Sequence, residues 1–426
     1  MNFKQNLTMF FGISFMLIFA LSGMLILREI RDVLLIQSFG SNSFVAILRL
    51  IQIPVTILLG IGAFFLTRNG KIKRAFHLFF PINILFSLLM LALFYFKGIS
   101  LHPSSASTAT IFNKIVASTF YFWVGFSNVF TIVLIWGFAN QHYTFKRASY
   151  QYPLILLIAS LSMGIYIKYL MGFIFEKKLY YLIFLTSAII YAIVYIIYFL
   201  LREVHLRKKD VLKKPSLKYL IALIAIVFFL SLAKQFPQLP FKYLLKQKAP
   251  QAKDYLMIMG SFSFKQAIYG VFTLLLGVLL GLWMYIKGSK LLAKIGGFLI
   301  IVITLLGLYV FKMPAKEATI DIKSAYSLMP YGMFMSFVAL FLYLIKELCY
   351  FRFPLKNRFS AKILVDLIFV SIAMPLSTYM STVVIVMKGS ILASNNIYMG
   401  MFFISMLICF IALYWINKEQ KNNLIE

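Results

Sequence analysis

The chain has 426 residues, of which 62% are hydrophobic and only 13% charged. A water-soluble fold could not bury that much apolar surface, so the composition excludes a soluble globular protein. Its 42 Lys and Arg against 12 Asp and Glu give a net charge of +30. This excess exceeds what orientation in a bilayer requires, so we expect a negatively charged partner: nucleic acid, anionic lipid or an anionic solute.

Apolar runs recur along the chain, and each can cross a hydrocarbon core about 30 Å thick. The first half predicts spans at residues 7–27, 44–67, 75–96, 115–138, 153–174 and 180–201. The second half predicts spans at residues 217–236, 257–286, 291–311, 325–345, 361–387 and 396–416. No small-residue cleavage site follows the first run, so it is interpreted as a span and not as a secretory signal. We therefore expect an all-α polytopic membrane protein with about 12 transmembrane helices.

The densest charge run, REVHLRKKDVLKK from Arg202 to Lys214, falls at the midpoint of the chain. A two-fold pseudo-repeat would place its linker there. The pattern predicts an N-terminal six-helix bundle (1–201), a basic cytoplasmic linker (202–216) and a C-terminal six-helix bundle (217–426).

Short basic loops alternate with less basic ones, and the positive-inside rule then places both termini and the linker in the cytoplasm. One group of lysines conflicts with this rule, because it lies on the side expected to be external: Lys242, Lys246, Lys248 and Lys253.

Charges within or beside the spans are the best site candidates, because an ionisable group there costs about 2.5–3.5 kcal/mol on insertion scales. The first span ends in LREIRD, where helical spacing brings Arg28 near Arg31 and Asp32. Two readings are open. The arginines form a clamp for phosphate or carboxylate, with Asp32 as a coupling or gating group, or the motif is an interfacial cap with internal ion pairs.

Three further positions have two readings each. Arg49, five residues into the second span, faces a cavity or snorkels to the interface. Lys346, at the end of the tenth span, binds substrate or pairs locally with Glu347, itself a candidate for gating. Asn140 contacts substrate or bonds between helices as packing.

Other chemistries lack their motifs. No GxxxxGK phosphate loop is present, and the four histidines show no metal-ligand spacing. Cys349 and Cys409 suggest neither a disulfide framework nor a metal site. We expect no cofactor, no metal and no nucleic-acid partner, since no soluble region is long enough to dock a duplex.

Two segments of the first half carry a family resemblance. One is ILREIRDVLLIQSFG at the end of the first span, and the other, more specific, is FYFWVGFSNVFTIVLIWGFANQHYTFKRASYQYPL, from Phe120 to Leu154. They resemble the nucleotide transport family, the ATP/ADP translocases of plastids and obligate intracellular bacteria. In the first segment Arg31 falls on the family's key basic position, and the second is similar to the family's fourth span, WGFAN signature and basic loop.

Two segments of the second half extend the resemblance. LPFKYLLKQKAPQAKDYLMIMGSFSF, from Leu239 to Phe264, is similar to the family's external segment and contains Lys242. KELCYFRFPLKNRFSAKILVD, from Lys346 to Asp366, is similar to the family's KE start with a later Lys and Asp. Lys346 matches a functional lysine of the family. The resemblance implies a fold like the major facilitator arrangement, with two bundles rocking about a central site.

The chain departs from the family at two glutamate positions, which hold Gly125 and Gln238 here. The family associates those glutamates with nucleotide selection and exchange, so Gln238 is a candidate coupling position and the substrate is left open.

The resemblance implies an antiporter, not an enzyme, that exchanges ATP and ADP across the inner membrane of an intracellular bacterium and acts as a monomer. The expected substrate-binding residues are Arg28, Arg31, Arg49, Asn140, Lys242 and Lys346. One alternative is proton-driven import of another nucleotide, NAD or a phosphorylated organic anion. A second is a membrane-embedded enzyme or scaffold that acts on anionic lipid.

Overall fold

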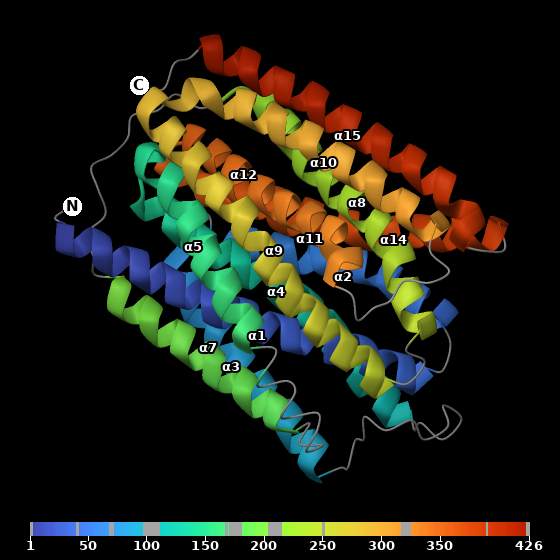
Figure 1. Cartoon of the computed structure of the whole chain (residues 1–426). Coiled ribbons are helices and arrows are strands. Elements are labelled where there is room, and N and C mark those ends of the chain that lie inside the picture. The colour runs from blue at the N-terminus through green and yellow to red at the C-terminus, as the bar shows by residue number, and fades with distance from the viewer. Residues whose placement is uncertain are drawn as a thin grey trace.

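The computed structural model describes residues 3–39, 42–67, 72–96, 111–166, 169, 181–202, 215–248, 252–316, 325–388 and 391–422. Some helical residues in these ranges are described by their backbone alone. Within the described part of the chain, 11 helices are long and apolar enough to cross a membrane. Figure 1 shows them as long, roughly antiparallel rods in one assembly. The prediction of an all-helical polytopic fold is confirmed.

The helices of the first half follow the predicted spans. They are α1 (Phe3–Phe39), α2 (Asn42–Thr67), α3 (Ile72–Phe96), α4 (Ile111–His142), α5 (Phe145–Tyr166) and α7 (Tyr181–Leu201). In this group α1 packs against α4, α5 and α7, and α3 packs against α7. The first helix is longer than the apolar run that predicts it, because it continues past Leu27 and carries the LREIRD motif within the same helix.

The second half begins with α8 (Leu217–Lys248), α9 (Ala252–Lys287), η4 (Ser289–Leu291) and α10 (Leu292–Lys316). It continues with α11 (Ala325–Leu340), η5 (Phe341–Ile345), α12 (Lys346–Cys349) and η6 (Tyr350–Arg352). The chain ends with α13 (Leu355–Lys362), η7 (Ile363–Phe369), α14 (Val370–Lys388) and α15 (Ile391–Asn422). Here α8 packs against α14 and α15, and α11 packs against α9 and α10.

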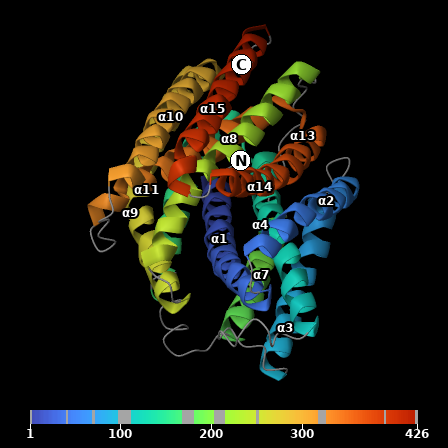
Figure 2. The same ribbon diagram turned by 90° about the vertical axis from the view of Figure 1, so that its right-hand side faces the viewer.

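Two long contacts join the groups. Helix α5 packs along α9, and α2 packs along α14 and η7; the turned view in Figure 2 also has α14 next to α2. The first contact is close, because a Cβ at Gly281 of α9 would overlap the carbonyl oxygen of Ser149 in α5. Small residues allow such backbone approach between membrane helices.

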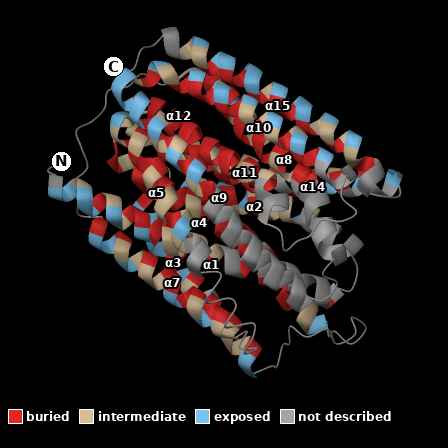
Figure 3. Ribbon diagram, in the orientation of Figure 1, coloured by how far each residue is buried: buried red, intermediate tan, exposed pale blue. Residues whose placement is uncertain are grey.

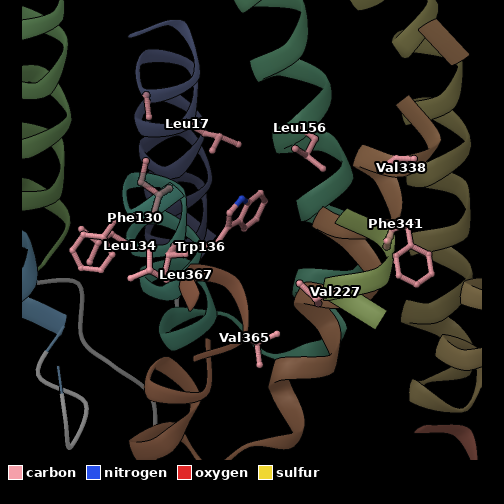
Figure 4. Packing of buried hydrophobic residues seen from close by; sticks show 14 of the residues in the cluster. Leu17, Phe130, Leu134, Trp136, Leu156, Val227, Val338, Phe341, Val365 and Leu367 are labelled. Carbon is pink, nitrogen blue, oxygen red and sulfur yellow. The ribbon is translucent and has the colours of Figure 1, made fainter. Parts of the chain in front are cut away.

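Residues coloured as buried lie toward the inside of the assembly in Figure 3, and many of the exposed residues are large and apolar. One apolar cluster extends through both groups. In Figure 4 its labelled members include Leu156 of α5, Val227 of α8 and Val338 of α11. Exposed residues such as Leu58, Phe96 and Ile286 suit contact with lipid.

Candidate functional site

Four charged side chains of the second group form one buried cluster. Lys346 Nζ lies 2.9 Å from Asp366 Oδ2 and 3.1 Å from Glu347 Oε1. Lys362 Nζ lies 2.5 Å from Glu347 Oε1 and 2.6 Å from Asp366 Oδ2. The four side chains are at most 7% exposed. Two positive and two negative charges therefore balance one another away from solvent.

Local helix geometry brings these charges together. Lys346 follows the π-helical turn η5, and Asp366 lies within the second π-helical segment, η7. Such turns alter which face a helix presents, and they are frequent at functional sites. Lys362 and Asp366 are four residues apart, so they share one helical face. Tyr350 adds a hydrogen bond, because its hydroxyl donates to Asp366 Oδ1 at 2.7 Å.

Asn140, at the end of α4, connects this cluster to the first group. Its Nδ2 donates to Glu347 Oε2 at 2.8 Å, and its Oδ1 accepts from the Tyr152 hydroxyl at 2.6 Å. Its main-chain carbonyl accepts from Arg358 Nη1 at 2.6 Å. Arg358 is buried and also donates to the carbonyls of Phe351 and Phe353. We call Asn140, Lys346, Glu347, Arg358, Lys362 and Asp366 the charged lock.

Burial makes the charged lock sensitive to the loss of any member. Taking ions from water costs several kcal/mol each, and close partners are needed to offset that cost. Glu347 is fully buried and holds Lys346, Lys362 and Asn140 at once. Of these contacts, the hydrogen bonds to Asn140 are the ones that join α4 to the second half of the chain.

A second cationic centre lies where α1, α2 and α4 converge. The Arg31 guanidinium stands over the ring of Tyr121, 4.7 Å from its centroid. One helical turn further along α4, a Cβ at Gly125 would collide with Nε2 of Gln52 and lie 3.5 Å from Arg31 Nη1. Tyr121 and Gly125 are buried, whereas Arg31 and Gln52 are partly exposed. The polar side chains of Arg31 and Gln52 therefore lie against a buried face of α4 and are themselves partly exposed.

The structure brings some predicted site residues together and leaves others undescribed. Asn140, Lys346 and Glu347 meet in the charged lock, and there Lys346 has the local ion pair with Glu347 that the sequence offered as one reading. Arg31 lies at the second centre. Five predicted residues lie in helices, but their side chains are outside the described part of the structure: Arg28, Asp32, Arg49, Gln238 and Lys242. Gln238 and Lys242 belong to α8 itself, which is longer than predicted.

Sequence reasoning assigned no role to Gln52, Tyr152, Tyr350, Arg358, Lys362 or Asp366. Lys362 and Asp366 stood in the KELCYFRFPLKNRFSAKILVD segment, and their four-residue spacing was a usable signal. Gln52 and Arg358 gave no such signal, because their partners are distant in sequence. In the described part of the chain, no group of three or more His, Cys, Asp or Glu side chains could hold a metal ion.

No protein-family model and no curated protein sequence matches the chain. Solved structures do match it. A bacterial homologue of the iron transporter ferroportin, in an outward-facing state, has a TM-score of 0.65 at 14% identity and covers 97% of this chain and 99% of its own. The human organic anion transporter MFSD10 has a TM-score of 0.61 at 9% identity, covering 94% and 99%.

The major facilitator superfamily transporter FucP, the E. coli fucose:proton symporter, in the outward conformation, has a TM-score of 0.61 at 13% identity, covering 94% of this chain and 98% of its own. These similarities extend over almost the whole chain, and the fold is that of major facilitator superfamily transporters. The named neighbours act on chemically unrelated compounds, so the similarity in fold specifies no ligand for this chain.

Proposed function

We propose that this chain is a secondary transporter that moves an anionic organic solute by alternating access. The observation that carries the proposal is the charged lock, which joins the two groups of helices through Asn140 and Glu347. Rocking of one group against the other separates α4 from α12 and breaks this contact. Glu347 then acts as the gating residue at that end of the protein.

The cationic centre around Arg31 is the reason for proposing a negatively charged solute. Arg31 is a permanently charged donor held against an aromatic face, within a chain of net charge +30. A partly exposed guanidinium between three helices suits a phosphate or carboxylate group. We assign substrate binding to Arg31, with Arg28, Arg49, Asn140, Lys242 and Lys346 as further contacts along the path. Asp32 and Gln238 are assigned to coupling or gating.

Nucleotides are the substrate class that the sequence resemblance favours, with ATP and ADP as the exchanged pair. A nucleoside triphosphate carries several negative charges, which suits a path lined by arginine and lysine. The likeness in fold to a human organic anion transporter is compatible with this class and does not select it.

The proposal includes an orientation of the chain in the membrane. Residues 1–201 and 217–426 form the two halves, and the linker at 202–216 and both termini face the cytoplasm. The charged lock then closes the cytoplasmic end, because α4 ends and α5 begins there. The protein acts as a monomer in the inner membrane of an intracellular bacterium.

A second candidate is proton-driven import of another nucleotide, NAD or a phosphorylated organic anion. Gly125 favours it, because the position that holds a glutamate in the resembling family carries no side chain here and lies beside Arg31. A transporter without that carboxylate has different charges at its centre and can couple differently.

Uptake of labelled ATP, AMP and NAD into proteoliposomes, each measured separately, tests both candidates. Unlabelled ADP, AMP, NAD and citrate serve as competitors, and a protonophore removes any proton gradient. Uptake that depends on internal ADP and resists the protonophore supports exchange. Uptake abolished by the protonophore supports the second candidate. Absence of uptake of every tested anion by correctly folded protein would refute anion transport.

A further inference from the structure

Helix α10 has an exposed apolar stripe with a lysine at each end. The exposed residues recur at three- and four-residue intervals, so they share one helical face: Lys294, Phe298, Ile301, Leu305, Tyr309 and Lys312. The two lysines are separated by about 27 Å at the helical rise per residue, close to the hydrocarbon thickness of about 30 Å. The stripe therefore fits a lipid-facing surface with one lysine in each headgroup region.

Helix α15 lies beside α10 and has a second exposed apolar stripe (Figures 1 and 2). The two helices are antiparallel, because a Cβ at Gly297 would lie 3.9 Å from Phe410, whereas a Cβ at Gly307 would overlap the ring of Phe402. Toward the end of α15 the exposed residues are Leu407, Phe410, Ile411, Tyr414 and Trp415. Tyrosine and tryptophan are enriched at membrane interfaces, so this end of the stripe fits the edge of the bilayer.

Four exposed lysines gather where α10 begins and α15 approaches its end. Gly288 has a φ of 78°, a left-handed conformation that glycine adopts readily, and it turns the chain from α9 into η4. This tight turn brings the last residue of α9 close to η4 and the start of α10, and η4 packs against α15. The Lys418 ammonium lies 5.8 Å from the centroid of the Trp415 ring. We call the four residues the lysine cluster: Lys287, Lys290, Lys294 and Lys418.

The lysine cluster has little negative charge beside it. Neither η4 nor α10 contains an Asp or Glu. Glu419 follows Lys418, but it acts electrostatically on Tyr219, a buried residue of α8. A soluble anion could balance the lysines but would leave the adjoining apolar stripes uncovered. A phospholipid with a net negative headgroup complements both the charge and the apolar surface.

We propose that an anionic phospholipid binds here, with its headgroup held by Lys290, Lys294 and Lys418 and its acyl chains along α10 and α15. The site lies at the same end of the molecule as the charged lock, because a Cβ at Gly296 of α10 would lie 3.2 Å from Ile345, the residue before Lys346. This inference does not depend on which solute the chain carries.

Quenching of Trp415 fluorescence by brominated phospholipid tests the site, because this exposed ring lies beside the lysine cluster. The full-length chain is reconstituted in phosphatidylcholine vesicles with increasing mole fractions of brominated phosphatidylglycerol or brominated phosphatidylcholine. A Trp415→Phe variant supplies the signal of the other tryptophans. Size-exclusion profiles before reconstitution establish that each variant folds.

Two double variants test the headgroup contacts. Lys290→Gln/Lys294→Gln removes two lysines of the cluster and leaves Lys418 over the reporter ring. Lys73→Gln/Arg74→Gln is the matched control, because it removes two exposed positive charges from α3 in the first group. Soluble glycerol 3-phosphate, added at constant ionic strength, distinguishes a lipid site from a site for a free phosphate group.

Brominated phosphatidylglycerol is expected to quench Trp415 at a mole fraction roughly five- to 25-fold lower than brominated phosphatidylcholine, because each lysine near an anionic surface adds about fivefold. Lys290→Gln/Lys294→Gln should remove most of this preference, and Lys73→Gln/Arg74→Gln and glycerol 3-phosphate should leave it unchanged. Equal quenching by the two lipids in the wild-type chain would overturn the proposal. So would a preference that survives Lys290→Gln/Lys294→Gln, or displacement of the brominated lipid by glycerol 3-phosphate.

Discussion

Asn140 Nδ2 donates a hydrogen bond to Glu347 Oε2 at 2.8 Å, although the two residues are 207 positions apart in the chain. Asn140 lies in the last turn of α4 in the first group, and Glu347 lies in the short helix α12 of the second. The neutral amide of Asn140 in the first group of helices is thus hydrogen-bonded to a fully buried carboxylate in the second group. Under the proposed function, we expect this contact to form in one conformation and to break in the other.

Replacement of Asn140 with alanine is expected to favour the conformation in which the charged lock is open. A hydrogen bond to a charged group contributes about 1.5–3 kcal/mol, so the open population should rise at least tenfold. Cys349 reports this change, because its thiol is buried two residues after Glu347. We expect faster reaction of Cys349 with a maleimide in the Asn140→Ala variant.

Cys409 provides an internal control for this labelling. It is fully buried in α15, a helix that contributes no residue to the charged lock, so its reactivity should not change. A Cys349→Ser variant identifies the labelled position. Equal labelling of Cys349 in wild-type and Asn140→Ala protein would contradict a gating role for the contact.

Glu347→Gln is expected to destabilise the protein by about 3–5 kcal/mol, the usual cost of removing one partner of a buried ion pair. The reason is that Lys346 and Lys362 are then left with Asp366 as their shared carboxylate. The free energy of unfolding in detergent measures the loss.

The double variant Glu347→Gln/Lys362→Met tests whether the charges act as a unit. It removes one charge of each sign and retains the Lys346–Asp366 pair. Its loss of stability should therefore be smaller than the sum of the two single losses. Strictly additive losses would argue against a coupled cluster.

Arg31→Gln is expected to raise the apparent KM for the transported anion at least tenfold, because the variant lacks the cation held over Tyr121. Arg31→Lys should recover part of the affinity, since an ammonium keeps the charge but lacks the planar fork. Initial uptake rates over a range of anion concentrations separate KM from maximal rate. Arg74→Gln, at an exposed position near the start of α3, is the matched control.

Gly281→Ala is expected to destabilise the contact between α5 and α9 by about 1–3 kcal/mol, the usual cost of overpacking. The added methyl group would overlap the Ser149 carbonyl oxygen, which belongs to the backbone and cannot rotate away. Gly62→Ala is the control, because a Cβ there meets nothing within 4 Å. A lower melting temperature for Gly281→Ala than for Gly62→Ala is the expected result; equal values would show that the helices can separate at no cost.

The sequence was sufficient to predict the helices. It was insufficient to predict which residues of different helices contact one another. Apolar runs of membrane length identify spans directly, because every backbone group in lipid must be bonded within its own helix. An apolar run ends where polar residues begin, but the helix that contains it can continue further along the chain. For this reason the predicted spans end at Leu27 and Phe236, whereas α1 and α8 continue to Phe39 and Lys248.

The contacts of the candidate site were likewise predictable only in part. Adjacent Lys346 and Glu347 indicated an ion pair, since neighbours in sequence are close in any fold. The bond between Asn140 and Glu347 and the approach of Gln52 to Gly125 depend on how separate helices pack, which no single helix encodes. The contact of the Arg31 guanidinium with the ring of Tyr121 likewise joins two helices that are separate in sequence.

Counter-flow of labelled ATP in proteoliposomes tests the central claim most directly. Vesicles that contain the purified chain are loaded with ADP or with buffer alone, and the initial rate of ATP uptake is compared between them. The account predicts uptake through the wild-type chain that internal ADP accelerates and that Arg31→Gln largely removes. Uptake of neither ATP nor any other phosphorylated anion, by protein that is folded and correctly inserted, would contradict it.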